Sequence, residues 1–541
     1  MPRQAIFLLL CVALATLFPP CSYALDTPAA DSTTRCNALR AEDFSRTPDA
    51  VTQITKAHAE DRSEDLPAYC EITGYVMPSI GFVLRLPSEN WNGKFIELGC
   101  GGTCGTTEHI ARCKNPLRRG YACVVSDGGN HSSGTDMKWA YNNPQAVVDY
   151  VVRASHVAAL AGKAIAEQYY KQAPRTSYFM GCSAGGWQAM MEAQRFPWDF
   201  DGIAAGGPNL SVSEDWMNLA WVNRALMGSG AEPVLSQKDL EALHKAVVAK
   251  CDLNDNVKDG VIGDPRVCRF APEEMSCAKS KRDGCLTPAQ IDAVRRIYGG
   301  PVTKAGNPTA LPHVFMGSEL GWLDWFGGSE RAPTKLYSYM PEWFRYYLFQ
   351  PNPGPAWTIK DLDFDRDYQR FGTSEITEAI NPDLRRLKSR NGKLLMYTGW
   401  NDMVAGVGRT VDYYENAEKL IGGRALTQDF LRLFVVPGMN HCSGGDGPYA
   451  IDYLSYLEAW VEKGHPPDKL IGSHVKVDEV MMNKALKGDQ DALRQMERRL
   501  QFPLDPATVE FSRPIYPYPT RAKYLGHGNP NDAANFGPVS P

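Results

Sequence analysis

The chain carries little net charge and contains no segment rich in lysine and arginine. Its 541 residues include 57 Lys and Arg against 62 Asp and Glu, a formal net charge of −5 at pH 7. Binding of nucleic acid or of an anionic membrane surface depends on a concentrated positive patch. We therefore expect neither nucleic acid nor a membrane among the partners of this protein, and we expect its ligand to be a small molecule.

Long hydrophobic runs, internal repeats and low-complexity tracts are also missing. The one marked apolar run, residues 6–18, follows Arg3 and precedes small residues that end at Ala24. A run this short is typical of a secretory signal rather than of a membrane span, which needs about 18 or more apolar residues. The pattern predicts a signal peptide over residues 1–24 and a soluble, secreted or periplasmic protein, monomeric or homodimeric.

Short apolar stretches alternate with helical ones along the rest of the chain, at residues 81–87, 94–99, 121–127, 177–181, 393–399 and 432–438. Continuous apolar runs of this length are typical of strands buried on both faces of a mostly parallel sheet. Residues 147–165 place apolar side chains at helical spacing between two of these strands. The order of strand, helix and strand predicts an α/β fold.

A region rich in Trp, Pro, Gly and cysteine pairs interrupts this alternation. We interpret residues 209–391 as an inserted lid domain, and we assign residues 25–208 and 392–541 to the catalytic domain that contains the sheet. Segments inserted after the strands of such sheets commonly cover the active site. The Pro- and Asn-rich tail after Phe511 is predicted to lack regular structure.

A serine between glycines follows the predicted strand at 177–181 and precedes an apolar helical run. The segment Gly-Cys-Ser-Ala-Gly fits the G-x-S-x-G turn, which raises the Ser183 hydroxyl above the end of a strand. In such a turn the backbone N–H of the next residue, Ala184, is one donor to the oxyanion of the reaction. The second donor is expected in the glycine-rich loop at 99–102.

A serine nucleophile also requires a base and a carboxylate that orients the base. Asp402 and His441 each follow a later predicted strand, in the order acid and then histidine that α/β-hydrolases use. Asp412 and Asp446 are weaker candidates for the acid, because neither follows a strand directly. The sequence therefore predicts that Ser183, His441 and Asp402 form a catalytic triad.

Cysteines stand beside two of these residues. Of the 14 cysteines, Cys11 and Cys21 lie in the predicted signal, which leaves an even number in a chain bound for an oxidising compartment. Cys182 precedes Ser183 and Cys442 follows His441, so a disulfide between them would fix the nucleophile beside its base.

A cluster of aspartates suggests a metal site. Residues 251–268 place four aspartates, Asp252, Asp255, Asp259 and Asp264, in a short segment between two cysteines. Four negative charges this close repel one another unless a cation lies among them, and carboxylate oxygens suit Ca²⁺. The spacing differs from that of an EF-hand loop.

Taken together, Cys-Ser at 182–183, Asp402 and His-Cys at 441–442 resemble the CS-D-HC motif of the tannase and feruloyl esterase family. The resemblance runs over nearly the whole mature chain, including Asn-Asp-Ala-Ala-Asn-Phe at 531–536. It implies an α/β-hydrolase core with a lid domain and ester hydrolysis through the three predicted residues. It also favours Gly101 as the second oxyanion donor, with Gly102 close behind.

The resemblance further implies a structural calcium site in the lid, with side-chain ligands from Asp252, Asp255 and Asp259 and carbonyl ligands from Val257 and Val261. Asp264 is less clearly a ligand. The implied disulfides are Cys36–Cys70, Cys182–Cys442, Cys251–Cys268 and Cys277–Cys285. The remaining cysteines, Cys100, Cys104, Cys113 and Cys123, have three possible pairings that the sequence leaves open.

The resemblance implies that the substrate is an aromatic ester. Lid aromatics, Trp322, Trp325, Trp343 and Phe344, are candidates to stack on an aromatic acid. We expect a hydroxycinnamic or gallic ester rather than mono(2-hydroxyethyl) terephthalate, because only Arg331 and Arg345 are candidates to bind a free carboxylate. The alternatives are a hydrolase of amides or lactones and, in another class, a non-catalytic binding protein stabilised by calcium.

Overall fold

The computed structural model describes residues 31–540, apart from 229–231, 279, 281, 330–333, 372–373, 477–491, 493–494 and 496–497. The predicted signal peptide lies outside the described residues. Within the described ranges, every helix falls short of the length and apolar character that crossing a bilayer requires.

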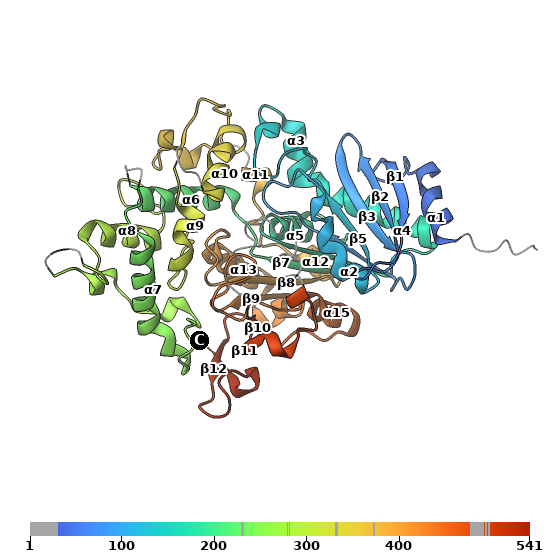
Figure 1. Cartoon of the computed structure of the whole chain (residues 1–541). Helices are drawn as coiled ribbons and strands as arrows, with labels where there is room; N and C mark the ends of the chain where they lie inside the picture. The colour runs from blue at the N-terminus through green and yellow to red at the C-terminus, as the bar shows by residue number, and fades with distance from the viewer. Residues whose placement is uncertain are drawn as a thin grey trace, which may run out of the picture.

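A nine-stranded mixed sheet runs through the centre of the molecule, in the order β1-β2-β3-β5-β4-β6-β7-β8-β9 (Figure 1). Its strands are β1 (Thr52–Glu60), β2 (Tyr69–Val76), β3 (Ile80–Pro87), β4 (Lys94–Leu98), β5 (Ala122–Ser126), β6 (Thr176–Cys182), β7 (Gly202–Gly206), β8 (Lys393–Gly399) and β9 (Leu431–Val436). Neighbouring strands from β5 to β9 are parallel, whereas β1, β2, β3 and β5 pair antiparallel. The predicted α/β fold with a mostly parallel sheet is therefore confirmed.

Helices and loops cover both faces of this sheet. The α-helices are α1 (Ser32–Ala38), α2 (Lys114–Arg118), α3 (Pro144–Val148), α4 (Ala154–Tyr170), α5 (Ala184–Arg195), α6 (Val212–Met227), α7 (Gln237–Cys251), α8 (Pro288–Gly299), α9 (Trp322–Phe326), α10 (Lys335–Trp343), α11 (Ser374–Thr377), α12 (Arg385–Ser389), α13 (Val407–Ile421), α14 (Arg424–Gln428) and α15 (Tyr453–Lys463). Strand β8 sends Leu394 and Met396 into one cluster of buried side chains and Leu395 and Tyr397 into another. Because side chains alternate along a strand, both faces of β8 are buried, as its continuous apolar sequence indicates.

Each of the six predicted strands overlaps a strand of this sheet. The predicted helix at 147–165 lies in a longer helical run, in which a π-helical turn at Asp149–Arg153 separates α3 from α4. Strands β1, β2 and β7 were not predicted. Strand β3 differs from the expectation, because it pairs antiparallel with both of its neighbours.

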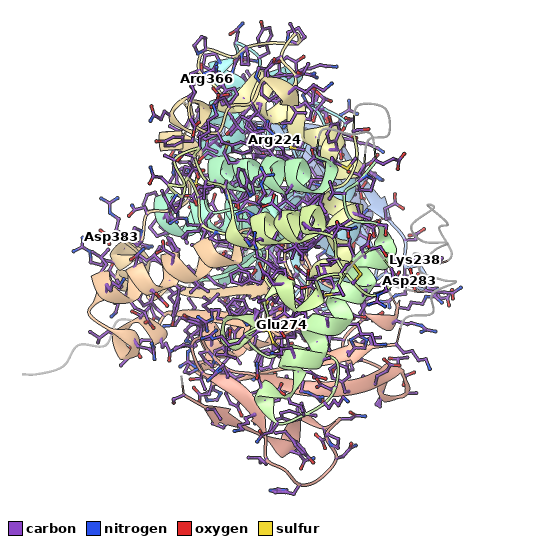
Figure 2. All side chains as sticks on the ribbon, turned by 90° about the vertical axis from the view of Figure 1, so that its left-hand side faces the viewer. Arg224, Lys238, Glu274, Asp283, Arg366 and Asp383 are labelled. Atoms are coloured by element: carbon purple, nitrogen blue, oxygen red, sulfur yellow. A yellow bond between two sulfur atoms is a disulfide. The ribbon has the colours of Figure 1, made fainter. Side chains whose placement is uncertain are left out.

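Residues 209–391 form a largely helical region beside the sheet, at the left of Figure 1. Helix α6 packs against α8, α9 and α10, so these helices form one unit. Figure 2 looks onto this region, and its labelled charged residues Lys238, Glu274, Asp283 and Arg366 lie on the outer surface. Its opposite side faces the carboxyl ends of the parallel strands.

The tail corrects one prediction. After Phe511 the chain was expected to lack regular structure, but it contains most of β11 (Val509–Ile515), β12 (Arg521–Tyr524) and β13 (Phe536–Val539). Strand β11 pairs with β10 (Leu470–Val475), and β12 pairs with β13. The prolines of this segment obscure the pattern, but an edge strand tolerates proline where no ladder N–H is needed.

Candidate active site

Ser183, Asp402 and His441 meet at the carboxyl edge of the sheet. They follow β6, β8 and β9, which are parallel neighbours or near neighbours, so their loops emerge side by side. The Nε2 atom of His441 lies 2.8 Å from the Ser183 hydroxyl. Its Nδ1 atom lies 3.0 Å from each carboxylate oxygen of Asp402. The structure thus brings together the three residues that the sequence singled out.

The turn that carries Ser183 has a strained backbone. Ser183 adopts φ 65° and ψ −126°, a region that favours glycine, and Ala184 then begins helix α5. A Cβ atom on Gly181 would lie 2.3 Å from the carbonyl oxygen of Gly185, so the turn closes only with glycine there. The sharp reversal directs the hydroxyl away from the sheet, as the G-x-S-x-G pattern predicts.

The carboxylate of Asp402 is held in place before it meets the imidazole. Asp402 is 1% exposed, and one of its oxygens accepts hydrogen bonds from the backbone N–H groups of Val404 and Ala405 at 2.9 and 3.0 Å. Trp325, from the 209–391 region, packs edge-on against the His441 ring at a centroid distance of 5.8 Å. Such an arrangement can accept the serine proton on Nε2 and stabilise the imidazolium that forms.

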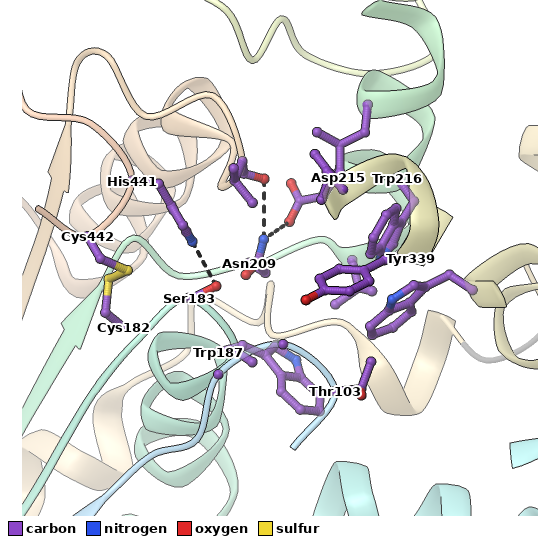
Figure 3. Close-up of a pocket in the computed structure, with 18 of the residues that line it drawn as sticks. Thr103, Cys182, Ser183, Trp187, Asn209, Asp215, Trp216, Tyr339, His441 and Cys442 are labelled. Carbon is purple, nitrogen blue, oxygen red and sulfur yellow. Dashed lines mark hydrogen bonds between the residues drawn. A yellow bond between two sulfur atoms is a disulfide. The ribbon is translucent and has the colours of Figure 1, made fainter. Parts of the chain in front are cut away.

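A disulfide ties the nucleophile turn to the loop that carries the histidine. Cys182 and Cys442 are bonded, with their Cα atoms 5.9 Å apart, across a sequence separation of 260 (Figure 3). Each cysteine is adjacent in the chain to a residue of the Ser183–His441 pair. The bridge therefore restrains the distance across which a proton would move.

The glycine-rich loop after β4 packs against helix α5. A Cβ atom on Gly99 would lie 2.6 Å from the Cα of Gly185, so the two backbones touch. Gln188 of α5 accepts a hydrogen bond from the Cys100 N–H at 3.0 Å. Gly101 and Gly102 then line the same pocket as Ser183, and Ala184, the first residue of α5, has an N–H without an intrahelical partner.

The pocket above Ser183 has a volume of about 370 Å³ and is mostly apolar. Its aromatic lining combines residues of the core and of the 209–391 region: Tyr150, Trp187, Trp216, Trp325, Tyr339 and Trp343. Trp216 and Trp343 stack at a centroid distance of 5.0 Å. Aromatic walls of this kind can pack against a planar ring of the substrate.

Two of the four aromatics expected to line the pocket do so. Trp325 and Trp343 line it, whereas Trp322 and Phe344 are fully buried in the core. Arg345 donates to the carbonyl of Trp357 and pairs with Glu342. Arg331 lies outside the described residues.

A polar group that the sequence did not predict lies at the aromatic end. Asn209 donates from its amide nitrogen to Asp215 at 2.9 Å and lies between Asp215 and Ser183 (Figure 3). Asp215 is 2% exposed, and its other oxygen lies 2.9 Å from Nε2 of His313. The β7–α6 loop and α6 supply Asn209 and Asp215, and no motif marks either residue, because only the fold places them beside the serine.

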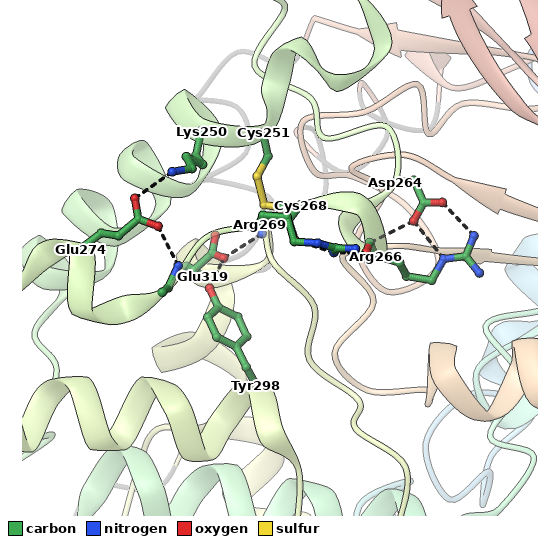
Figure 4. Close-up of a disulfide and its surroundings, with 11 residues drawn as sticks. Lys250, Cys251, Asp264, Arg266, Cys268, Arg269, Glu274, Tyr298 and Glu319 are labelled. Atoms are coloured by element: carbon green, nitrogen blue, oxygen red, sulfur yellow. Dashed lines mark hydrogen bonds and ion pairs between the residues drawn. A yellow bond between two sulfur atoms is a disulfide. The ribbon is translucent and has the colours of Figure 1, made fainter. Parts of the chain in front are cut away.

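The aspartate-rich loop lies in the 209–391 region, away from Ser183. Asp252 accepts from the N–H groups of Asp259 and Gly260, and Asp259 pairs with Arg513. Burial, together with the charges of Asp259 and Asp252, raises the pKa of Asp255 to about 7. Asp264 instead forms a two-point ion pair with Arg266, beside the Cys251–Cys268 disulfide (Figure 4).

Six disulfides are present among the described residues. The four that the resemblance implied are all formed: Cys36–Cys70, Cys182–Cys442, Cys251–Cys268 and Cys277–Cys285. The pairing that the sequence left open is Cys100–Cys104 and Cys113–Cys123. The first of these bridges flanks Gly101 on both sides.

Comparisons with known proteins agree on one family. The chain matches tannase and feruloyl esterase over residues 68–539. It is 31% identical over 517 residues to an uncharacterized esterase of Xanthomonas campestris, which covers 87% of this chain and 84% of that protein. It is also 31% identical over 545 residues to mono(2-hydroxyethyl) terephthalate hydrolase of Piscinibacter sakaiensis. That match covers 88% of this chain and 85% of the relative. Feruloyl esterase B of Aspergillus oryzae shares the fold, with a TM-score of 0.78 at 24% identity over 94% of this chain and 100% of that chain.

Proposed function

Because this chain belongs to the tannase and feruloyl esterase family, whose members are carboxylic ester hydrolases, we propose that it is a serine esterase acting on esters of aromatic acids. The observation that carries the proposal is the hydrogen-bonded series from Ser183 through His441 to Asp402 at the end of an aromatic pocket.

In the proposed mechanism the Ser183 oxygen attacks the ester carbonyl carbon while His441 takes its proton. The N–H groups of Ala184 and Gly101 are proposed to stabilise the oxyanion that forms. The imidazolium then gives its proton to the departing alcohol, which leaves an acyl-enzyme. Water, deprotonated by His441, attacks this intermediate, releases the acid and restores the serine.

The aromatic end of the pocket supports a hydroxycinnamic or gallic acyl group. Trp216, Trp343 and Trp187 offer ring faces at this end, while Asp215 places a carboxylate beside them. A negative charge in a buried site disfavours a second negative charge. We therefore propose a neutral hydroxy-aromatic acid over a terephthalate monoester, whose acyl half carries a free carboxylate.

We also propose that residues 209–391 act as a lid and that the aspartate-rich loop holds structural calcium. The lid role is supported by the contact of Trp325 with His441. Asp252, Asp255 and Asp259 would supply side-chain oxygens, and Val257 and Val261 would supply carbonyl oxygens. Burial and the charges of Asp259 and Asp252 raise the pKa of Asp255, and a bound cation would offset this repulsion. Asp264 forms an ion pair with Arg266, so we do not include it among the proposed calcium ligands.

The six disulfides favour an oxidising compartment, and we propose that the protein is secreted or periplasmic. Its activity can be tested with purified protein on methyl ferulate, methyl gallate, a terephthalate monoester and an anilide. Hydrolysis of the first two, faster than of the others, is the expected result. If a fluorophosphonate fails to label Ser183 and no ester is cleaved, the protein is a binding protein and the proposal is wrong.

A further inference from the structure

Among the described residues that line the pocket, Arg112 is the arginine that no carboxylate balances. Arg112 lies in the turn Glu108–Cys113 after β4 and lines the pocket together with Ser183 and His441. A Cβ atom on Gly101 would lie 3.7 Å from its Nη2, which places the guanidinium beside the oxyanion loop. Across the described ranges, no carboxylate lies within ion-pair distance of Arg112, whereas Arg118 and Arg119 each pair with an acid.

Arg112 also stands at a junction between two cavities. It lines a neighbouring surface cleft of about 280 Å³, in which Lys114, Arg118 and Arg498 accompany it. Asp65 is the acid among the described residues that line this cleft, and it lies 3.5 Å from Arg118 and 3.8 Å from Arg498. Arg118 and Arg498 share this one acid, so arginines outnumber acids among the described residues of the cleft, and Arg112 connects the cleft to the pocket.

The two ends of the pocket differ in burial and in charge. Trp187, Trp216 and Trp343, at the aromatic end, are 2%, 8% and 6% exposed, whereas Arg112 is exposed to solvent. In ester hydrolysis the alcohol leaves first, while the acyl group stays bound to the serine. The open end beside Arg112 therefore suits the alcohol half of the ester, and the closed aromatic end suits the acyl half.

We infer that Arg112 is a specificity-determining residue that binds a carboxylate on the alcohol half of the ester, as in an ester of a sugar acid or another hydroxy acid. A guanidinium presents paired N–H donors that match the two oxygens of a carboxylate. The basic cleft beyond Arg112 adds long-range attraction for the same charge. This inference rests on the proposed function, since it names the leaving group of the proposed reaction.

The test uses two esters with the same feruloyl group, one of 4-hydroxybutyric acid and one of 4-hydroxybutyramide, which differ only in the charge of the alcohol half. At low salt the wild type is expected to show a kcat/KM roughly 5- to 20-fold higher on the carboxylated ester, mainly through KM. The preference should shrink between 50 and 500 mM NaCl, because salt screens exposed charges. Arg112→Gln should abolish the preference, and Arg112→Lys should keep part of it.

Arg385→Gln is the matched control, because Arg385 is an exposed arginine that pairs with Asp383 and lines neither the pocket nor the cleft. Circular dichroism and Tm would verify that each variant is folded. Equal kcat/KM of the wild type on the two esters would overturn the inference. So would an Arg112→Gln variant that loses kcat equally on both, since that result assigns Arg112 to the oxyanion loop. If neither ester is cleaved, the proposed function fails, and the inference fails with it.

Discussion

Consider the double substitution of Cys182 and Cys442 by serine, which removes the covalent link between the nucleophile turn and the histidine loop. The bridge closes a sequence separation of 260 residues. The chain-entropy relation assigns about 5.5 kcal/mol to a loop of that size, and measured losses are usually about 2–4 kcal/mol. A chain of about 500 residues unfolds with an entropy of about 1 kcal/mol per kelvin, so Tm should fall by only about 2–5 °C.

Activity should fall much further than stability. Without the bridge, the 2.8 Å contact between His441 and Ser183 depends on the loop after β9, in which Cys442 itself has a positive φ of 65°. A displacement of about 1 Å between reacting groups can cost about 100-fold in rate. We therefore expect kcat to fall by about 10- to 100-fold while the protein stays folded.

The assay is kcat on methyl ferulate together with Tm from thermal unfolding, after mass spectrometry has verified that the bridge is absent. The control is the double substitution of Cys277 and Cys285 by serine, which opens a bridge of sequence separation 8 in the 209–391 region. That variant should lose some Tm and little kcat. A Cys182/Cys442 variant with kcat within twofold of the wild type would refute the reasoning, because Ser183 and His441 would then keep their geometry without the disulfide.

Four further outcomes are expected. Ser183→Ala should abolish ester hydrolysis with the far-UV circular dichroism unchanged, and residual turnover above 1% in the pure variant would contradict the nucleophile assignment. Asp402→Asn should lower kcat by about 10⁴-fold, because the amide favours the wrong tautomer of His441, and a loss below tenfold would point to another acid. Removal of calcium by EDTA should lower Tm, and added Ca²⁺ but not Mg²⁺ should restore it; an unchanged Tm in both EDTA and Ca²⁺ would exclude the proposed site. Burial raises the pKa of Glu378 to about 7, so the ionisation of Glu378 should subtract from the stability of the wild type as pH rises from about 4.5 through 7. Glu378→Gln should therefore raise Tm at pH 8 but not at pH 4, and an equal effect at both pH values would contradict this reasoning.

Ser183, Asp402 and His441 could be located from the sequence because each follows a strand whose apolar side chains are contiguous. Strands β6, β8 and β9 are buried on both faces, and their sequences reflect it directly. A parallel sheet brings the ends of such strands to one edge, so the order of Ser183, Asp402 and His441 was sufficient to group them.

Strand β7 could not be recognised, although it lies between β6 and β8. Its sequence Gly-Ile-Ala-Ala-Gly has weak strand propensity, and its glycines are needed because neighbours approach closely. A Cβ atom on Gly206 would lie 2.3 Å from the hydroxyl oxygen of Tyr397. Tertiary packing therefore determines this strand, and such packing is not visible in a single sequence.

The substrate pocket was equally hidden. Asn209 and Asp215 come from the segment after β7 and Arg112 from the segment after β4, and only the folded chain brings them to one cavity. The aromatic residues of the 209–391 region were ambiguous for a related reason, because Trp322 and Trp343 have the same hydrophobic character but only Trp343 lines the pocket. Composition identifies which side chains will be buried and does not distinguish a core from a cavity wall.

The left-handed backbone at Ser183 has an evolutionary consequence. At φ 65° a glycine has less backbone strain than any residue with a side chain, so replacing Ser183 by glycine should stabilise the folded state. A population freed from the need for hydrolysis should drift toward glycine at this position and gain thermal robustness as it does so. Ser183 is therefore a position at which stability and chemistry favour different residues.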